Sequence, residues 1–271
     1  MNENQAREAI CRVGRSLFER GYVHATAGNI SVRLDDGYLI TPTDASLGTL
    51  DPARLARLDA QGQQLSGDRG SKTIVLHRQI YEAATRFDTG TRCVIHTHST
   101  HCVALSLQRG LSALPAPAPL TGLELLPALT PYFVMKVGHV PLIPYHRPGA
   151  PEAAQAVAQA IAHYGELGAP IRAVMLERLG PNVWHDSPEA AMATLEELVK
   201  TYREQVNPKL TIAVAEDVAV VEAPSSAKED EKDAKDAAQK KEPDVPPSRP
   251  MGTIVVYLMG LVIVIGGVWY F

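Results

Sequence analysis

The stretch Arg92-Cys-Val-Ile-His-Thr-His-Ser-Thr-His101 is the part of the chain from which its fold and chemistry are best inferred. Its β-branched residues predict a strand that ends among polar side chains. Because side chains two apart on a strand point to the same face, His96 and His98 present two imidazoles to one place. Such a pair is half of a divalent-metal site, but the pair alone is also typical of packed or solvated histidines.

Composition limits what the chain can be. With 271 residues, 45% of them hydrophobic, it can bury the core of one large domain or two small ones. A net charge of −4 gives no indication of nucleic-acid binding. Three cysteines without a C-x-x-C pair argue against a disulfide framework and predict reduced thiols in a cytoplasmic compartment. The N-terminus shows no secretory signal.

The composition changes abruptly near Leu210. Residues 211–252 combine a run of Lys, Glu, Asp and Ala with several prolines, which predicts a disordered linker because little apolar surface can be buried. The uncharged run 253–271 predicts a single C-terminal transmembrane helix, since at about 1.5 Å per residue it matches a bilayer core. We therefore expect a domain at 1–210 in the cytoplasm, anchored to a membrane by this tail.

Three polar turns adjoin predicted strands or helices in the first part of the chain. They contain Gly28-Asn29, the segment 41–46 and the segment 67–72, with Lys72 at the start of a helical pattern. If the turns converge, their backbone N–H groups and hydroxyls form a phosphate site. Each turn alone is also typical of an ordinary loop.

The remaining patterns predict an α/β domain with a mixed sheet, because hairpins and helices alternate without a regular βαβ repeat. An amphipathic helix runs through Ala6, Ile10, Val13 and Leu17, and a second begins at Ser187-Pro188. Further helices are expected at 74–87, 100–107 and 151–164, and further strands at 38–41, 132–137, 140–143, 171–176 and 182–184.

Several of these motifs together resemble the class II aldolase/adducin family. They are Ala27-Gly-Asn-Ile-Ser31, Thr41-Pro-Thr-Asp44, Ser71-Lys72, the His96/His98 pair, and Val140-Pro-Leu-Ile-Pro-Tyr145 with Arg147-Pro-Gly149. Within the family, the chain is most similar to the 3-oxo-tetronate 4-phosphate decarboxylase and fuculose-phosphate aldolase branch. The resemblance covers about the first 205 residues and none of the tail.

This resemblance implies a three-layer α/β/α domain with a mixed, mostly antiparallel sheet, assembled as a homotetramer. It implies a lyase, aldolase or decarboxylase, that cleaves a C–C bond of a small phosphorylated sugar or sugar acid through a metal-stabilised enediolate. His96 and His98 would hold Zn²⁺ or another divalent metal. The residues expected around the substrate's phosphate are Gly28, Asn29, Thr43, Asp44, Ser71 and Lys72.

Two positions depart from the family pattern. Thr73 stands where the family has a catalytic glutamate, and a threonine hydroxyl has no pKa suited to acid–base catalysis. Leu179 stands where the family has its third zinc histidine, so His185 is the candidate replacement, with His139 and His146 as others. The alternative to a lyase is therefore a catalytically silent, aldolase-like binding or scaffold domain tethered to a membrane.

Overall fold

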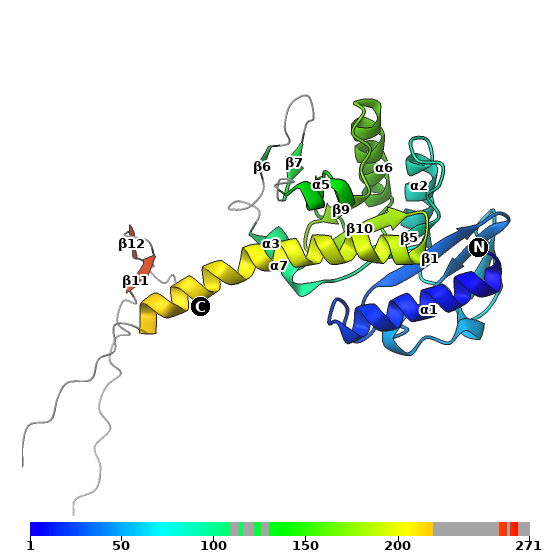
Figure 1. Ribbon diagram of the computed structural model, residues 1–271, viewed down its shortest axis with the longest axis horizontal. Helices are drawn as coiled ribbons and strands as arrows, with labels where there is room; N and C mark the ends of the chain where they lie inside the picture. Colours follow the sequence, from blue (N-terminus) through cyan, green and yellow to red (C-terminus); the bar gives the residue numbers. More distant parts are fainter. Residues whose placement is uncertain (109–113, 116–121, 126–129, 219–254, 259–260, 265–271) are drawn as a thin grey trace, which may run out of the picture. The chain divides into compact units, whose positions relative to one another are not determined.

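The computed structural model describes residues 1–108, 114–115, 122–125, 130–218, 255–258 and 261–264 (Figure 1). Contacts divide the chain into two units, Met1–Glu222 and Ala223–Phe271, and each is described by itself. The first unit contains all the residues expected to bind substrate or metal.

The first unit is built on one sheet whose strand order is β4-β3-β2-β1-β5-β10-β9-β8. Neighbouring strands are antiparallel except β8 and β9, which are parallel, so the predicted mixed and mostly antiparallel sheet is confirmed. The strands are β1 (Asn29–Leu34), β2 (Gly37–Ile40), β3 (Ala56–Asp59), β4 (Gln64–Ser66), β5 (Cys93–His96), β8 (Leu142–Ile143), β9 (Ala173–Leu176) and β10 (Gly180–His185). A separate pair joins β6 (Leu114–Pro115) to β7 (Leu123–Glu124).

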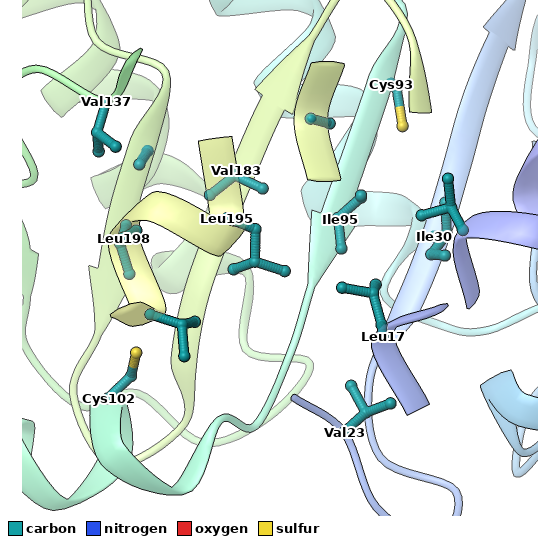
Figure 2. Packing of buried hydrophobic residues seen from close by; sticks show 14 of the residues in the cluster. Leu17, Val23, Ile30, Cys93, Ile95, Cys102, Val137, Val183, Leu195 and Leu198 are labelled. Atoms are coloured by element: carbon teal, nitrogen blue, oxygen red, sulfur yellow. The ribbon is translucent and has the colours of Figure 1, made fainter. Parts of the chain in front are cut away.

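Helices cover both faces of the sheet, and alternate residues of each strand supply the two cores. Ile95 and Val183 pack with α1 (Glu3–Glu19), α3 (Thr100–Leu107), α5 (Pro131–Lys136) and α7 (Pro188–Val218), as Figure 2 shows in part. Val94 and Trp184 pack with α2 (Ile74–Ala84) and α6 (Pro151–Glu166). This arrangement is the predicted α/β/α order of layers. Two short 3₁₀ helices, Leu47–Thr49 and Pro52–Arg54, lie between β2 and β3.

The helix ends follow their local sequence. Asn2 and Gln5 form a reciprocal capping box at the start of α1. Ser187 accepts from the Ala190 N–H (3.3 Å) and Pro188 occupies the first turn of α7, as expected. The segment expected as a strand at 132–137 is instead the helix α5, because Thr130 caps it by accepting from the Phe133 N–H at 3.1 Å and Pro131 starts it.

The helix α7 continues to Val218, so the domain end expected at residue 210 falls inside a helix. The rest of the predicted linker, from residue 219 on, lies outside the described residues. Within the predicted transmembrane segment, the described parts form an antiparallel pair, β11 (Val255–Leu258) with β12 (Leu261–Val264). Among the described residues, no helix has the length and apolar character needed to cross a membrane.

Candidate active site

A cavity of about 600 Å³ opens where β5 ends, on the side of the sheet that α2 and α6 cover. Its walls come from β1, the turn before α2, the residues after β5, the loop that leads into α6, and β10. Three cationic side chains, Arg69, Lys72 and Arg147, line it, whereas none of its described lining residues is Asp or Glu. The cavity is therefore suited to an anionic ligand.

His96 and His98 both line this cavity, and their ring centroids are 4.8 Å apart. The His96 Nδ1–H donates to the Pro181 carbonyl oxygen at 3.0 Å, since a carbonyl can only accept. That bond orients the ring and leaves the lone pair of Nε2 available. A histidine held in this way by a backbone carbonyl is typical of metal ligands.

Both imidazoles are neutral near pH 7. Burial lowers the pKa of His96 to about 3, and the neighbouring His98 adds to the effect. Burial also lowers the pKa of His98, with a smaller effect from His24. Neutral imidazole is the form that binds a metal ion, so the pair is in the state that ligation requires.

Two of the three predicted phosphate turns are joined directly. The Ser71 N–H donates to the Thr41 carbonyl (3.1 Å), and the Thr43 hydroxyl donates to the Gly70 carbonyl (2.9 Å). Ser71 and Lys72 line the cavity just before the first turn of α2. The backbone N–H groups of Ser71, Ile74 and Val75 donate within the protein, so the hydroxyl and the ammonium group are what this turn offers to an anion. Thr43 lies behind them and holds the turn in place.

The third turn also reaches the cavity. Asn29 lines it and pairs across the sheet with His96. Gly28 has φ +87°, and a Cβ there would lie 2.9 Å from the His96 carbonyl oxygen, so only glycine allows this close approach. Asp44, with φ +58°, is exposed and does not line the cavity. The structure thus brings Asn29, Ser71 and Lys72 to the cavity and places Gly28, Thr43 and Asp44 around it.

His185 is not brought to the histidine pair, which corrects the expected third ligand. On β10 it pairs with Cys93, at the far end of β5, whereas Asn182 pairs with His96. His185 also falls on the strand positions that face α1 and α7, the opposite face of the sheet. Its Nδ1 lies 2.9 Å from the Asp186 carboxylate. The register between strands β5 and β10, which was not predictable from local sequence, excludes it.

The other two histidines considered as third metal ligand, His139 and His146, differ in whether they reach the cavity. His139 Nδ1 donates to the Glu124 carboxylate at 2.8 Å and does not line the cavity. His146 does line it. Among the described residues, no group of three His, Cys, Asp or Glu side chains is placed to hold a metal ion.

The two positions that depart from the family pattern both face the cavity. Thr73 shares a hydrogen bond with Ser71 (Oγ1 to Oγ, 2.8 Å), so the site has a hydroxyl pair where a carboxylate was expected. Leu179 contributes an apolar surface next to the histidines.

Sequence reasoning missed Asn182 and Arg69, both of which line the cavity. The available signal for Asn182 was its place as a polar residue inside a buried strand, Gly180–His185. Asn182 is fully buried, and neither atom of its amide has a hydrogen-bond partner. The imidazole pair and the nearby amide oxygens are a donor set that fits a divalent cation.

Comparison with known proteins identifies the family. The family model for the class II aldolase and adducin N-terminal domain matches residues 8–206. The chain is 52% identical over 199 residues to 3-oxo-tetronate 4-phosphate decarboxylase of Cupriavidus necator, covering 73% of this chain and 82% of that protein. It is 40% identical over 200 residues to the decarboxylase of that name from Escherichia coli K12, covering 73% and 85%.

Two crystal structures are similar to the first unit. YgbL from Escherichia coli matches with a TM-score of 0.60 and 37% identity, covering 74% of this chain and 88% of that one. The L-fuculose-1-phosphate aldolase from Thermus thermophilus matches with a TM-score of 0.60 and 26% identity, covering 78% and 99%. The family model and these identities show that the chain belongs to the class II aldolase and adducin N-terminal domain family.

Proposed function

We propose that the chain is a divalent-metal-dependent lyase that decarboxylates a small phosphorylated 3-oxo sugar acid. The observation that carries the proposal is the cavity itself, in which neutral His96 and His98 meet a cationic, carboxylate-free lining. The relatives named 3-oxo-tetronate 4-phosphate decarboxylase, at 52% and 40% identity, support this substrate class.

The substrate named for these relatives carries a phosphate at one end and a carboxylate at the other. The phosphate is bound by the side chains of Ser71 and Lys72 before the start of α2, with Arg69 beside them. Arg147, from the loop that leads into α6, adds positive charge for the second anionic group. Two anionic groups on one small molecule thus match three cations in one cavity.

His96 and His98 would hold the divalent metal through their free ring nitrogens. When bound, such a metal accepts the negative charge that develops on the ketone oxygen as the C–C bond breaks. The ring of His96 stays in its orientation because Pro181 holds its other nitrogen.

Thr73 favours decarboxylation over aldol cleavage. In the decarboxylation of a 3-oxo acid, the bond between C1 and C2 breaks and its electron pair moves toward the ketone, so no proton has to be removed first. CO₂ leaves, and C2 then takes a proton from water to give a phosphorylated three-carbon ketose. Aldol cleavage instead requires a base to remove a hydroxyl proton, a role for which a threonine hydroxyl is unsuited. The chain also keeps a cavity lined by cationic side chains, so we favour the lyase over the catalytically silent scaffold domain.

The test is an assay on the full chain with 3-oxo-tetronate 4-phosphate in the presence of Zn²⁺, Mn²⁺ or Co²⁺. We expect release of CO₂ together with a phosphorylated three-carbon ketose, and loss of both products in His96→Ala. Substrate binding without CO₂ release under any of these metals would establish the silent binding domain instead. Failure to bind the substrate would contradict both functions.

We also propose that the chain forms a homotetramer and that residues 253–271 anchor it to a membrane. Analytical ultracentrifugation of the full chain in detergent, which measures the mass of the assembly, tests the homotetramer. The anchor predicts that the full chain floats with lipid vesicles, whereas a chain ended after Val218 stays at the bottom of the gradient. Equal sedimentation of the two chains would contradict the anchor.

A further inference from the structure

Three polar side chains form a row across the sheet at the edge of the cavity. Asn29 on β1 and Asn182 on β10 each pair in register with His96 on β5. Paired residues on neighbouring strands share a face and bring their Cβ atoms to about 4.5–5.5 Å. His96 is therefore flanked on both sides by an amide, and all three residues line the cavity.

The amides in this row lack partners. Asn182 is 0% exposed, and neither its Oδ1 nor its Nδ2 has a hydrogen bond, while Asn29 Oδ1 is also unpartnered. Leaving such a buried group unsatisfied destabilises the fold, because the group loses its bonds to water without gaining others. A fully buried polar side chain that faces a cavity without a partner indicates a ligand at that place.

Asn182 is the polar side chain that β10 offers to this face. The residues of β10 that share the face are Gly180, Asn182 and Trp184, of which Trp184 packs in the core under α6. Gly180 lies against His98, and a Cβ on it would come within 2.2 Å of the Thr97 carbonyl oxygen. No side chain fits there, so Asn182 is the first group on β10 that can reach a ligand held by the histidines.

Three of the unpaired atoms around His96 are acceptors, namely His96 Nε2, whose ring proton is on Nδ1, and the two amide oxygens. The Nδ2 group of Asn182, a donor, is also unpaired. A divalent cation satisfies several such acceptors at once, whereas a neutral hydrogen-bond donor satisfies one or two. Histidines alone leave the site one protein ligand short, because catalytic metal sites usually have three.

We propose that the amide oxygen of Asn182 is the third protein ligand to the divalent cation, beside His96 and His98. It takes the role of the histidine that Leu179 replaces, and this inference rests on the proposed metal-dependent function. A carbonyl-type oxygen is a harder ligand than imidazole, so the site shifts its preference from Zn²⁺ toward Mn²⁺ relative to a three-histidine site.

The experiment is calorimetric titration of the metal-free full chain with Mn²⁺ and, separately, with Zn²⁺. Asn182→Leu keeps the volume but removes the oxygen, so it should weaken Mn²⁺ binding by about tenfold or more. Asn182→Asp supplies an anionic oxygen and should strengthen it. His185→Leu, on the same strand but on the opposite face of the sheet, is the control and should leave the Kd for Mn²⁺ within about threefold.

Thermal unfolding of each metal-free variant shows whether the fold is kept, and Asn182→Asp provides a second variant should Asn182→Leu not fold. Unchanged Mn²⁺ and Zn²⁺ affinity in both Asn182 variants would overturn the inference while leaving the proposed function intact. Loss of binding in His146→Ala but not in Asn182→Leu would assign the third ligand to His146 instead. A wild-type chain that binds neither metal would sink the metal-dependent function itself.

Discussion

The two faces of strands β5 and β10 have the same backbone but opposite character. On the face toward α1 and α7, Ile95 and Val183 close a continuous apolar core (Figure 2). On the other face, at the same end of the strands, His96 and Asn182 line an open cavity. The comparison shows that one strand supplies stability and chemistry at alternate residues, so neighbouring substitutions should have separable effects.

The largest expected effect is on the cavity face. His96→Ala removes a proposed metal ligand, and we expect it to lower the rate of CO₂ release by about a thousandfold or more. Stability should change far less, because the ring packs beside a cavity rather than within a core. Steady-state kinetics and urea unfolding of the same preparation measure the two effects. Retained activity would show that the cavity is not where the reaction occurs.

The neighbouring residue should behave in the opposite way. Ile95→Ala creates a hole in the packed face, and we expect the free energy of unfolding to fall by about 2–5 kcal/mol. The activity per folded molecule should stay within about twofold, because the side chain of Ile95 points to the opposite face of the sheet from the cavity. Urea unfolding checks the first and kinetics at low temperature the second. If the folded fraction also lost activity, the two faces of the strand would not have separable effects.

Beneath the cavity, His77 tests how strongly burial holds an imidazole neutral. Burial lowers its pKa to about 3, and its Nδ1 lies 2.8 Å from the Ser31 hydroxyl. Below pH 6.5 the unfolded chain binds a proton that folded His77 does not, so the free energy of unfolding falls as the pH falls. Between pH 7 and pH 5 this loss is about 2 kcal/mol for His77.

Urea unfolding at the two pH values, compared between wild type and His77→Gln, isolates this contribution. The variant should lose less stability on acidification, because glutamine does not titrate. An equal pH dependence in the two proteins would show that His77 is not kept neutral by the fold.

The smallest expected effect is that of replacing Lys72, one of the cationic side chains that line the cavity. Lys72 lines it but is exposed, so its attraction to a phosphate is screened by water and salt. We expect Lys72→Ala to raise KM for a phosphorylated substrate about tenfold with little change in kcat. Lys72→Arg should restore most of the loss. A change in kcat alone would place Lys72 in the chemical step and not in substrate binding.

The sequence was most informative where the relevant geometry is local. The His96/His98 pair, the turn with Ser71 and Lys72, and the capped start of α7 each depend on residues a few positions apart, and the structure has them as expected. The mixed sheet followed from the same periodic patterns. The helix α5 was misread as a strand because its apolar residues lack a clear period of two or of 3.6.

The third position beside the histidines depended on the tertiary structure. Local sequence favoured His185 because histidine is the commonest ligand, yet the register of β10 against β5 sets Asn182 opposite His96 and His185 opposite Cys93. A shift of one residue exchanges the two faces of a strand, and no local pattern fixes the pairing of segments so far apart in sequence. The sequence by itself thus determined the imidazole pair and the polar turns near it, while only the assembled sheet decided which polar group stands next to His96.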